Sequence, residues 1–118
     1  MVEASKDDHI CPFESVYRTA LVFGGETKFV LSGSGHIAGV VNHPDSKKYQ
    51  HWLNPDLKPT GGEWLENAEE IPGSWWPTWW DWLRPKSGRK VIAKQPKDMG
   101  LGAAPGNYAK VRLSDIKL

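Results

Sequence analysis

The apolar run Lys-Phe-Val-Leu at residues 28–31 constrains the fold more than any other part of this sequence. Because it is almost continuously apolar, it suits a strand buried on both faces, as in a parallel sheet, better than a half-exposed strand. A glycine-rich turn, Ser-Gly-Ser-Gly at residues 32–35, follows and leads directly to His36. The pattern predicts an α/β fold with an imidazole at the carboxyl end of a buried strand.

A helix is predicted before this strand. Between residues 13 and 23, apolar side chains recur at the three- and four-residue spacing of an amphipathic helix: Phe13, Val16, Tyr17, Ala20 and Leu21. Pro12 suits the start of such a helix, and Gly24 and Gly25 end it.

The sheet is expected to be incomplete. Residues 2–5 can be the truncated end of a second strand, but residues 46–62 are expected to be mostly loop because Pro55 and Pro59 interrupt any long helix. Residues 63–68 can form one or two helical turns. Since a buried parallel strand needs neighbours on both sides, we expect the C-terminal part of a larger α/β protein. Its segments would be an acid loop, helix, strand and histidine loop (1–45), a loop and tryptophan-rich helix (46–88) and a loosely structured tail (89–118).

Five of the seven tryptophans lie close together, at positions 75, 76, 79, 80 and 82. Ser74 is a suitable N-cap for a helix over residues 75–83, with Pro77 in its first turn. Tryptophans four residues apart make two faces of this helix aromatic. We expect these faces to be buried, against this chain or the rest of a larger protein. The alternative is an apolar contact surface for a partner.

Composition excludes several classes of function. The net charge is +1 and the basic residues are scattered, which argues against nucleic-acid binding. One cysteine cannot form an internal disulfide, so a reducing compartment is expected. There is no secretory signal pattern and no apolar run near the roughly 20 residues that span a bilayer. We therefore expect a cytoplasmic protein without a membrane span.

Asp8 and His36 are the candidate catalytic residues. An acid on one loop followed by a histidine on the next is the order in which α/β-hydrolases present the last two members of their triad. Asp8 would fix the tautomer of His36 at a distance of about 2.6–3.2 Å, and Asp7 could do so by spacing. The alternatives are a surface histidine on a glycine-rich turn and a solvated carboxylate near a helix N-terminus.

The single cysteine and the other three histidines predict no further chemistry. Cys11 is interpreted as a small packing residue, because two nearby aspartates would disfavour a thiolate nucleophile. His9, His43 and His51 show no recognised metal-ligand spacing with Asp8 or Asp45, so no metal site is expected.

Four segments together resemble one known family. They are Lys-Asp-Asp-His-Ile-Cys-Pro at residues 6–12, the run from Phe29 to Gly39, Pro-Gly-Ser-Trp-Trp-Pro at residues 72–77, and Ala-Pro-Gly-Asn-Tyr-Ala-Lys at residues 104–110. In this order, and over nearly the whole chain, they are similar to the C-terminal end of class I polyhydroxyalkanoate synthases. One departure is Ser32-Gly33, where the family commonly has Gly-Ala.

The resemblance implies a fold, a reaction and two residue roles. The fold would be the C-terminal portion of an α/β-hydrolase domain, with its last strand, both catalytic loops and a tryptophan-rich helix. The reaction would be polymerisation of (R)-3-hydroxyacyl groups from coenzyme A thioesters, with release of coenzyme A and no other cofactor. His36 would activate a nucleophilic cysteine. Asp8 would orient His36 or activate the hydroxyl of the growing chain.

The family's nucleophile lies in a Gly-x-Cys-x-Gly box that these 118 residues do not contain, and Met1 falls within a strand of the family pattern. We therefore expect a fragment that is inactive alone, cytoplasmic and associated with polyester granules. The alternative is a non-catalytic tryptophan-rich module that binds a granule surface or a synthase subunit. A third interpretation is a remnant that does not unfold cooperatively.

Overall fold

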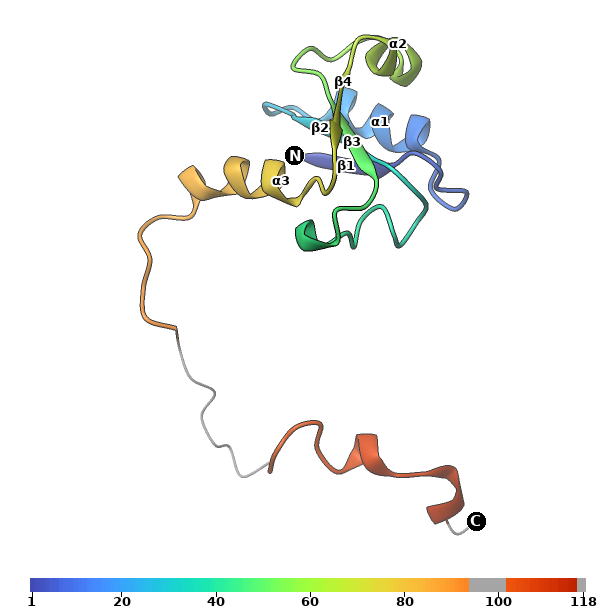
Figure 1. Cartoon of the computed structure of the whole chain (residues 1–118), viewed down its shortest axis with the longest axis vertical. Helices are drawn as coiled ribbons and strands as arrows, with labels where there is room; N and C mark the ends of the chain where they lie inside the picture. The colour runs from blue at the N-terminus through green and yellow to red at the C-terminus, as the bar shows by residue number, and fades with distance from the viewer. Residues whose placement is uncertain (94–101, 117–118) are drawn as a thin grey trace. The chain divides into compact units, whose positions relative to one another are not determined.

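A sheet with strand order β1-β2-β3-β4 organises the first of the two units of the chain. The computed structural model describes residues 1–93 and 102–116, and its units are Met1–Gly88 and Arg89–Leu118. The strands are β1 (Val2–Ser5), β2 (Phe29–Ser32), β3 (Gln50–Leu53) and β4 (Glu69–Pro72). The helices of the first unit are α1 (Phe13–Val22), η1 (Pro44–Ser46), α2 (Gly61–Glu66), α3 (Trp76–Leu83) and η2 (Arg84–Lys86) (Figure 1).

The predicted buried strand is confirmed as β2. Each of its residues is at most 2% exposed. It pairs in parallel with β1, which places Ser5 opposite Ser32, and antiparallel with β3 on its other side. The α/β class is therefore confirmed, as a mixed rather than a purely parallel sheet.

The expectation of one full strand and the end of another is wrong, because β3 and β4 add two further strands to the sheet. The strand β3 lies within the stretch expected to be loop, and both prolines follow it. Its sequence, Gln-His-Trp-Leu, buries His51. The strand β4, Glu-Glu-Ile-Pro, carries charge and a terminal proline, which are features of an edge strand. Neither sequence has a strong strand signal, so pairing of β3 with β2 and of β4 with β3 decides their conformation.

The helix α1 is confirmed, and it packs with α2 to form an aromatic core against β2. Tyr17 of α1, Phe29 of β2 and Trp64 of α2 are at most 1% exposed. The Phe29 ring meets both others edge-on, with centroids 4.9 Å apart. The Tyr17 hydroxyl donates to the carbonyl of Lys58 and accepts from its N–H, both at 2.8 Å. The Tyr17 side chain thus ties the loop after β3 to α1.

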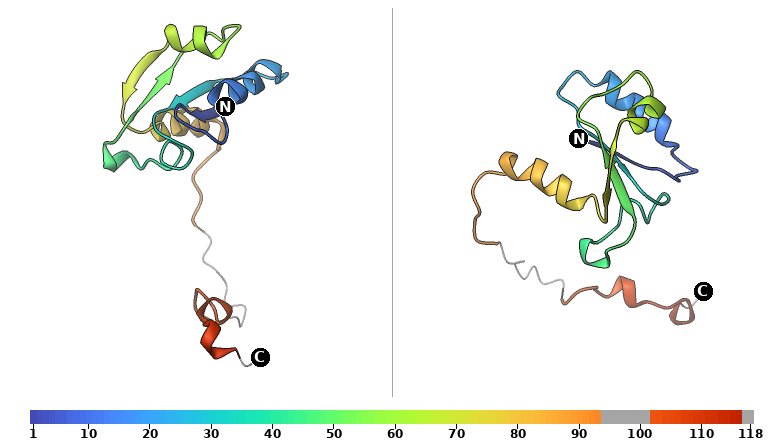
Figure 2. Two further views of the ribbon diagram at one scale, coloured as in Figure 1. Left: turned by 90° about the vertical axis from the view of Figure 1, so that its right-hand side faces the viewer. Right: turned by 45° about the horizontal axis from the view of Figure 1, so that its top comes forward.

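The helix α3 begins one residue later than predicted, with Trp75 rather than Ser74 as its N-cap, and the described part of this chain does not bury its aromatic faces. Ser74 Oγ accepts from the N–H of Trp76, and Pro77 lies in the first turn. No residue of α3 is buried, and Trp79 and Trp80 are 40% and 52% exposed. The helix follows β4 and lies apart from α1 and α2 (Figure 2). Among the described residues no segment covers both aromatic faces of α3, and burial against the rest of a larger protein stays a prediction.

The described part of the second unit consists of short turns. It contains the 3-10 helices η3 (Tyr108–Lys110) and η4 (Leu113–Asp115), and nearly all its side chains are exposed. The loosely structured tail expected over residues 89–118 stays a prediction, and residues 94–101 and 117–118 of it lie outside the described residues. No helix among the described residues is long and apolar enough to cross a membrane.

Candidate active site

Two loops meet at the carboxyl ends of β1 and β2. The parallel pairing continues beyond the strands, because the N–H of Lys6 donates to Ser32 O at 2.8 Å and that of Asp7 donates to Ser34 O at 3.0 Å. Adjacent parallel strands bring the residues after them to the same sheet edge. The acid loop and the histidine loop are thereby held side by side by main-chain bonds.

Asp8 and His36 are in direct contact at this edge. Asp8 Oδ2 lies 2.8 Å from His36 Nδ1, within the distance expected from the sequence. The other carboxylate oxygen, Oδ1, accepts from the N–H groups of Ile10 at 2.8 Å and Cys11 at 2.9 Å. Asp7, the alternative partner by spacing, contributes a main-chain bond instead. The structure therefore selects Asp8 as the partner of His36.

Hydrogen bonding keeps Asp8 ionised. The pKa of Asp8 is lowered to about 2, and the largest cause is the hydrogen bond from the N–H of Cys11. Burial raises this pKa, whereas the hydrogen bonds from His36 and Ile10 lower it further. An ionised carboxylate can only accept, so in the neutral form of His36 the proton lies on Nδ1 and the lone pair on Nε2. The Asp8 side chain is 7% exposed and that of His36 is 43% exposed. The pair thus presents a basic nitrogen near the surface.

A close approach of the backbone shapes the histidine loop. Ser34 has a φ of 74°, and the following turn is held by the N–H of Gly39, which donates to Gly35 O at 2.9 Å. A Cβ on Gly39 would overlap Ser5 Oγ and would lie 2.8 Å from both Gly33 O and Ser32 Oγ. Only glycine lets this loop lie against the ends of β1 and β2.

Replacing Gly39 with alanine should therefore destabilise the loop. We expect the free energy of unfolding to fall by about 1–3 kcal/mol, as for other overpacked sites. Urea denaturation would measure this loss. Gly25→Ala is the matched control, since nothing lies within 4 Å of a Cβ at that position. Equal stability of the two variants would contradict the close approach.

The lowered pKa of Asp8 predicts an acid-sensitive fold. The carboxyl titrates at about 2 in the folded chain but at the ordinary value of 3.8 when exposed, so the unfolded state binds more protons between these values. The contribution of Asp8 to stability is present above about pH 4 and is lost as the pH falls toward about 2. Urea unfolding of the wild type and of Asp8→Asn across this range would measure it. A stability difference between them that does not shrink with acid would contradict this assignment.

The structure corrects the interpretation of Cys11. It is exposed rather than packed, and one ligand atom each of Asp8, Cys11 and His36 lie within 4.8 Å of one another. The expectation of no metal site rested on histidine–aspartate spacings and did not include Cys11. The three-residue spacing of Asp8 and Cys11, on one turn, was the available signal.

The other histidines lie elsewhere. His43 Nδ1 is 3.7 Å from Asp45 Oδ2, at an exposed position. His51 is buried, with Nδ1 3.1 Å from Gly73 O and Nε2 3.2 Å from Thr78 Oγ1. Burial lowers the pKa of His51, so it is a neutral structural link between β3 and the segment leading into α3. His9 is exposed, and neither it nor His43 or His51 is part of the Asp8 cluster.

Part of the tryptophan segment packs on the chain that follows His36. The indole N–H groups of Trp75 and Trp76 both donate to Val40 O, at 3.2 and 2.9 Å. The Trp76 ring also meets His43 edge-on, at 5.7 Å. The first turn of α3 therefore supports the segment after the histidine loop, while Trp79 and Trp80 face solvent.

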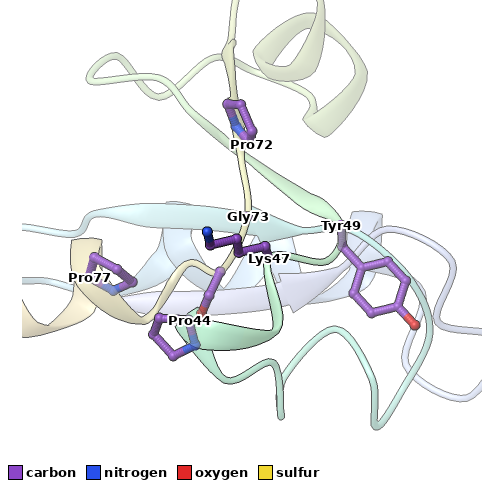
Figure 3. A pocket seen from close by; sticks show the side chains of 7 residues that line it. Pro44, Lys47, Tyr49, Pro72, Gly73 and Pro77 are labelled. Atoms are coloured by element: carbon purple, nitrogen blue, oxygen red, sulfur yellow. The ribbon is translucent and has the colours of Figure 1, made fainter.

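Two hollows flank this helix. One, of about 360 Å³, is lined by Pro44, Trp76, Pro77, Trp79 and Trp80. The other, of about 390 Å³, is polar in part and includes Lys47 and Tyr49. Figure 3 shows Pro44 and Pro77 along one side of the second hollow and Tyr49 on the other. Neither Asp8 nor His36 lines them.

Comparisons with known proteins relate the chain to a group of polymerases. No family model matches it. It is 48% identical over 112 residues to poly(3-hydroxyalkanoate) polymerase subunit PhaC of Rhizobium etli, covering 92% of this chain and 18% of that protein. It is 45% identical over 111 residues to the same subunit of Rhizobium meliloti, with 92% and 18% covered. For poly(3-hydroxyalkanoate) polymerase 2 of Ectopseudomonas oleovorans the identity is 40% over 116 residues, with 92% and 20% covered. The chain thus spans about a fifth of the length of these relatives.

Proposed function

We propose, because the chain is homologous to a segment of the poly(3-hydroxyalkanoate) polymerases, that it supplies the acid and the base of their acyl-transfer site. The substrates would be (R)-3-hydroxyacyl-coenzyme A and the growing polyester, in the cytoplasm at granule surfaces. The contact of Asp8 Oδ2 with His36 Nδ1 at 2.8 Å carries this proposal. It is the arrangement that directs the lone pair of Nε2 toward a reacting group.

In the proposed reaction, His36 Nε2 takes the proton of a cysteine thiol that lies outside these 118 residues. The thiolate adds to the thioester carbonyl, and coenzyme A leaves as the thiol with the proton returned by His36. His36 then takes the proton of a 3-hydroxyl group, whose oxygen attacks the acyl-cysteine. An ester bond forms as the acyl–sulfur bond breaks, and His36 returns the proton to the departing cysteine thiolate.

The surroundings of Asp8 favour an orienting role over direct activation of the hydroxyl. A carboxylate with a pKa of about 2 is a weak base, and the two oxygens of Asp8 already accept from two N–H groups and contact His36. A general base works best when its pKa is near the operating pH. We therefore assign proton transfer to His36 and its orientation to Asp8.

Segment exchange tests this proposal. Residues of this chain would replace the matching segment of the Rhizobium etli polymerase, and coenzyme A release from 3-hydroxybutyryl-coenzyme A would be measured. We expect the chimera to be active and the isolated 118-residue chain to be inactive. Release of coenzyme A by the isolated chain would contradict the proposed division of the site, as would a folded but inactive chimera.

The exposure of Trp79 and Trp80 favours a second function, contact with a polyester granule or a synthase subunit. These rings line the hollow with Pro44 and Pro77, and contiguous exposed aromatic surface is typical of interaction sites. Cosedimentation with polyester granules should be lost in the double variant Trp79→Ala/Trp80→Ala. The control is Phe23→Ala, at a 57% exposed aromatic residue on another surface. Equal cosedimentation of both variants would exclude this surface.

A further inference from the structure

We propose that Asp8, Cys11 and His36 form a binding site for a thiophilic divalent cation, with Zn²⁺ as the best match. One ligand atom of each residue lies within 4.8 Å of the others. The set combines thiolate sulfur, imidazole nitrogen and carboxylate oxygen, which are the three ligand types of protein-bound zinc. Mg²⁺ and Ca²⁺ prefer oxygen ligands alone, so the sulfur selects against them.

The spacing is close to that of a zinc site. Bond lengths of about 2.0–2.3 Å to a tetrahedral Zn²⁺ place neighbouring ligand atoms roughly 3.3–3.8 Å apart. On binding, the 2.8 Å distance between Asp8 and His36 would lengthen slightly. The longer distances among the three ligand atoms, which all lie within 4.8 Å of one another, would shorten. Cys11 and His36 are exposed, so rotation of their side chains can make this adjustment without disturbing the core.

The backbone already fixes two of the three ligands relative to the third. Asp8 Oδ1 accepts from the N–H of Cys11 at 2.9 Å, which holds both on one turn, while main-chain bonds hold the histidine loop beside it. Little chain entropy would be lost on binding. Three protein ligands leave a fourth position for water, as in zinc sites that remain open.

Metal binding would compete with proton transfer. A bound Zn²⁺ would take a ring nitrogen of His36 and an oxygen of Asp8, the groups assigned above to acyl transfer. The cation would then be a reversible inhibitor. This consequence rests on the proposed function, whereas metal binding itself does not.

Calorimetric titration of the 118-residue chain with ZnCl₂, in a phosphine reductant, tests the site. We expect one equivalent to bind and the affinity of Cys11→Ser to be weaker by about tenfold or more, since a thiolate bond is lost. His43→Ala is the matched control, because His43 and Asp45 form an exposed pair outside this cluster. No binding by the wild type, equal affinity of Cys11→Ser, or loss of binding in His43→Ala would each overturn the proposal.

Alkylation gives a second readout that does not depend on activity. Cys11 is the only cysteine, so its reaction with iodoacetamide reports on this site alone. Zn²⁺ should slow the reaction in the wild type and in His43→Ala, and slow it much less in His36→Gln. Circular dichroism of each variant would establish that the fold is retained. Equal protection in His36→Gln would remove the imidazole from the ligand set.

Discussion

Replacing His36 with glutamine is expected to lower coenzyme A release by the chimeric polymerase by about 10²–10⁴-fold, the usual contribution of a positioned general base. Glutamine keeps a polar side chain of similar length but cannot take up a proton. Since the base acts on bound substrate, the loss should fall on kcat rather than on KM. Steady-state kinetics with 3-hydroxybutyryl-coenzyme A would measure both.

Asp8→Asn should produce a loss of the same order. An amide can donate to Nδ1, which would favour the tautomer that places the proton on Nε2 and so removes the free lone pair. The matched controls are His43→Gln and Asp45→Asn, at the exposed pair separated by 3.7 Å, which should leave the rate unchanged. Activity of His36→Gln within tenfold of the parent chimera would refute the role of His36 as the base.

Truncation of Trp64 to alanine should have the largest effect on stability. Trp64 is 0% exposed and packs against Phe29 and Tyr17, with ring centroids 4.9 and 6.0 Å away. The cavity left at such a site typically lowers the free energy of unfolding by about 3–5 kcal/mol. Urea denaturation of the 118-residue chain, followed by circular dichroism, would measure the change.

Trp80→Ala is the control for this substitution, because Trp80 is 52% exposed and the same atoms are removed without opening a cavity. Its effect should stay within about 1 kcal/mol. Trp64→Phe should cost less than Trp64→Ala, since the indole nitrogen of Trp64 has no hydrogen-bond partner among the described residues. A Trp64→Ala variant as stable as Trp80→Ala would show that the aromatic core does not hold the sheet and helices together.

The absence of any cooperative transition in the wild type would support the interpretation of a remnant.

Local signals were sufficient for the first half of the chain. The periodicity of residues 13–23 predicted α1, and the apolar run before the glycines predicted β2 to within one residue. The order of acid and base on successive loops predicted the contact of Asp8 with His36. In each case a short segment carries its own pattern, and the parallel pairing of β1 and β2 brings the two loops together.

The second half depends on contacts between distant residues. The strands β3 and β4 have weak strand propensity; β3 forms by pairing with the free edge of β2, and β4 forms by pairing with β3. His51 can be buried there because Gly73 and Thr78 complete its hydrogen bonds from beyond the strand. None of these partners could be recognised from the sequence around His51.

By itself, the sequence predicted His36 as a candidate base and an aspartate of the preceding loop as its partner, because residue type and chain order suggest that chemistry. It also indicated the family, through motifs that keep their order along the chain. Only the tertiary structure decided that Cys11 lies beside Asp8 and His36 and that Trp79 and Trp80 face solvent. The physical reason is that exposure and cross-loop distance depend on what packs against each side chain, and those neighbours come from other parts of the chain.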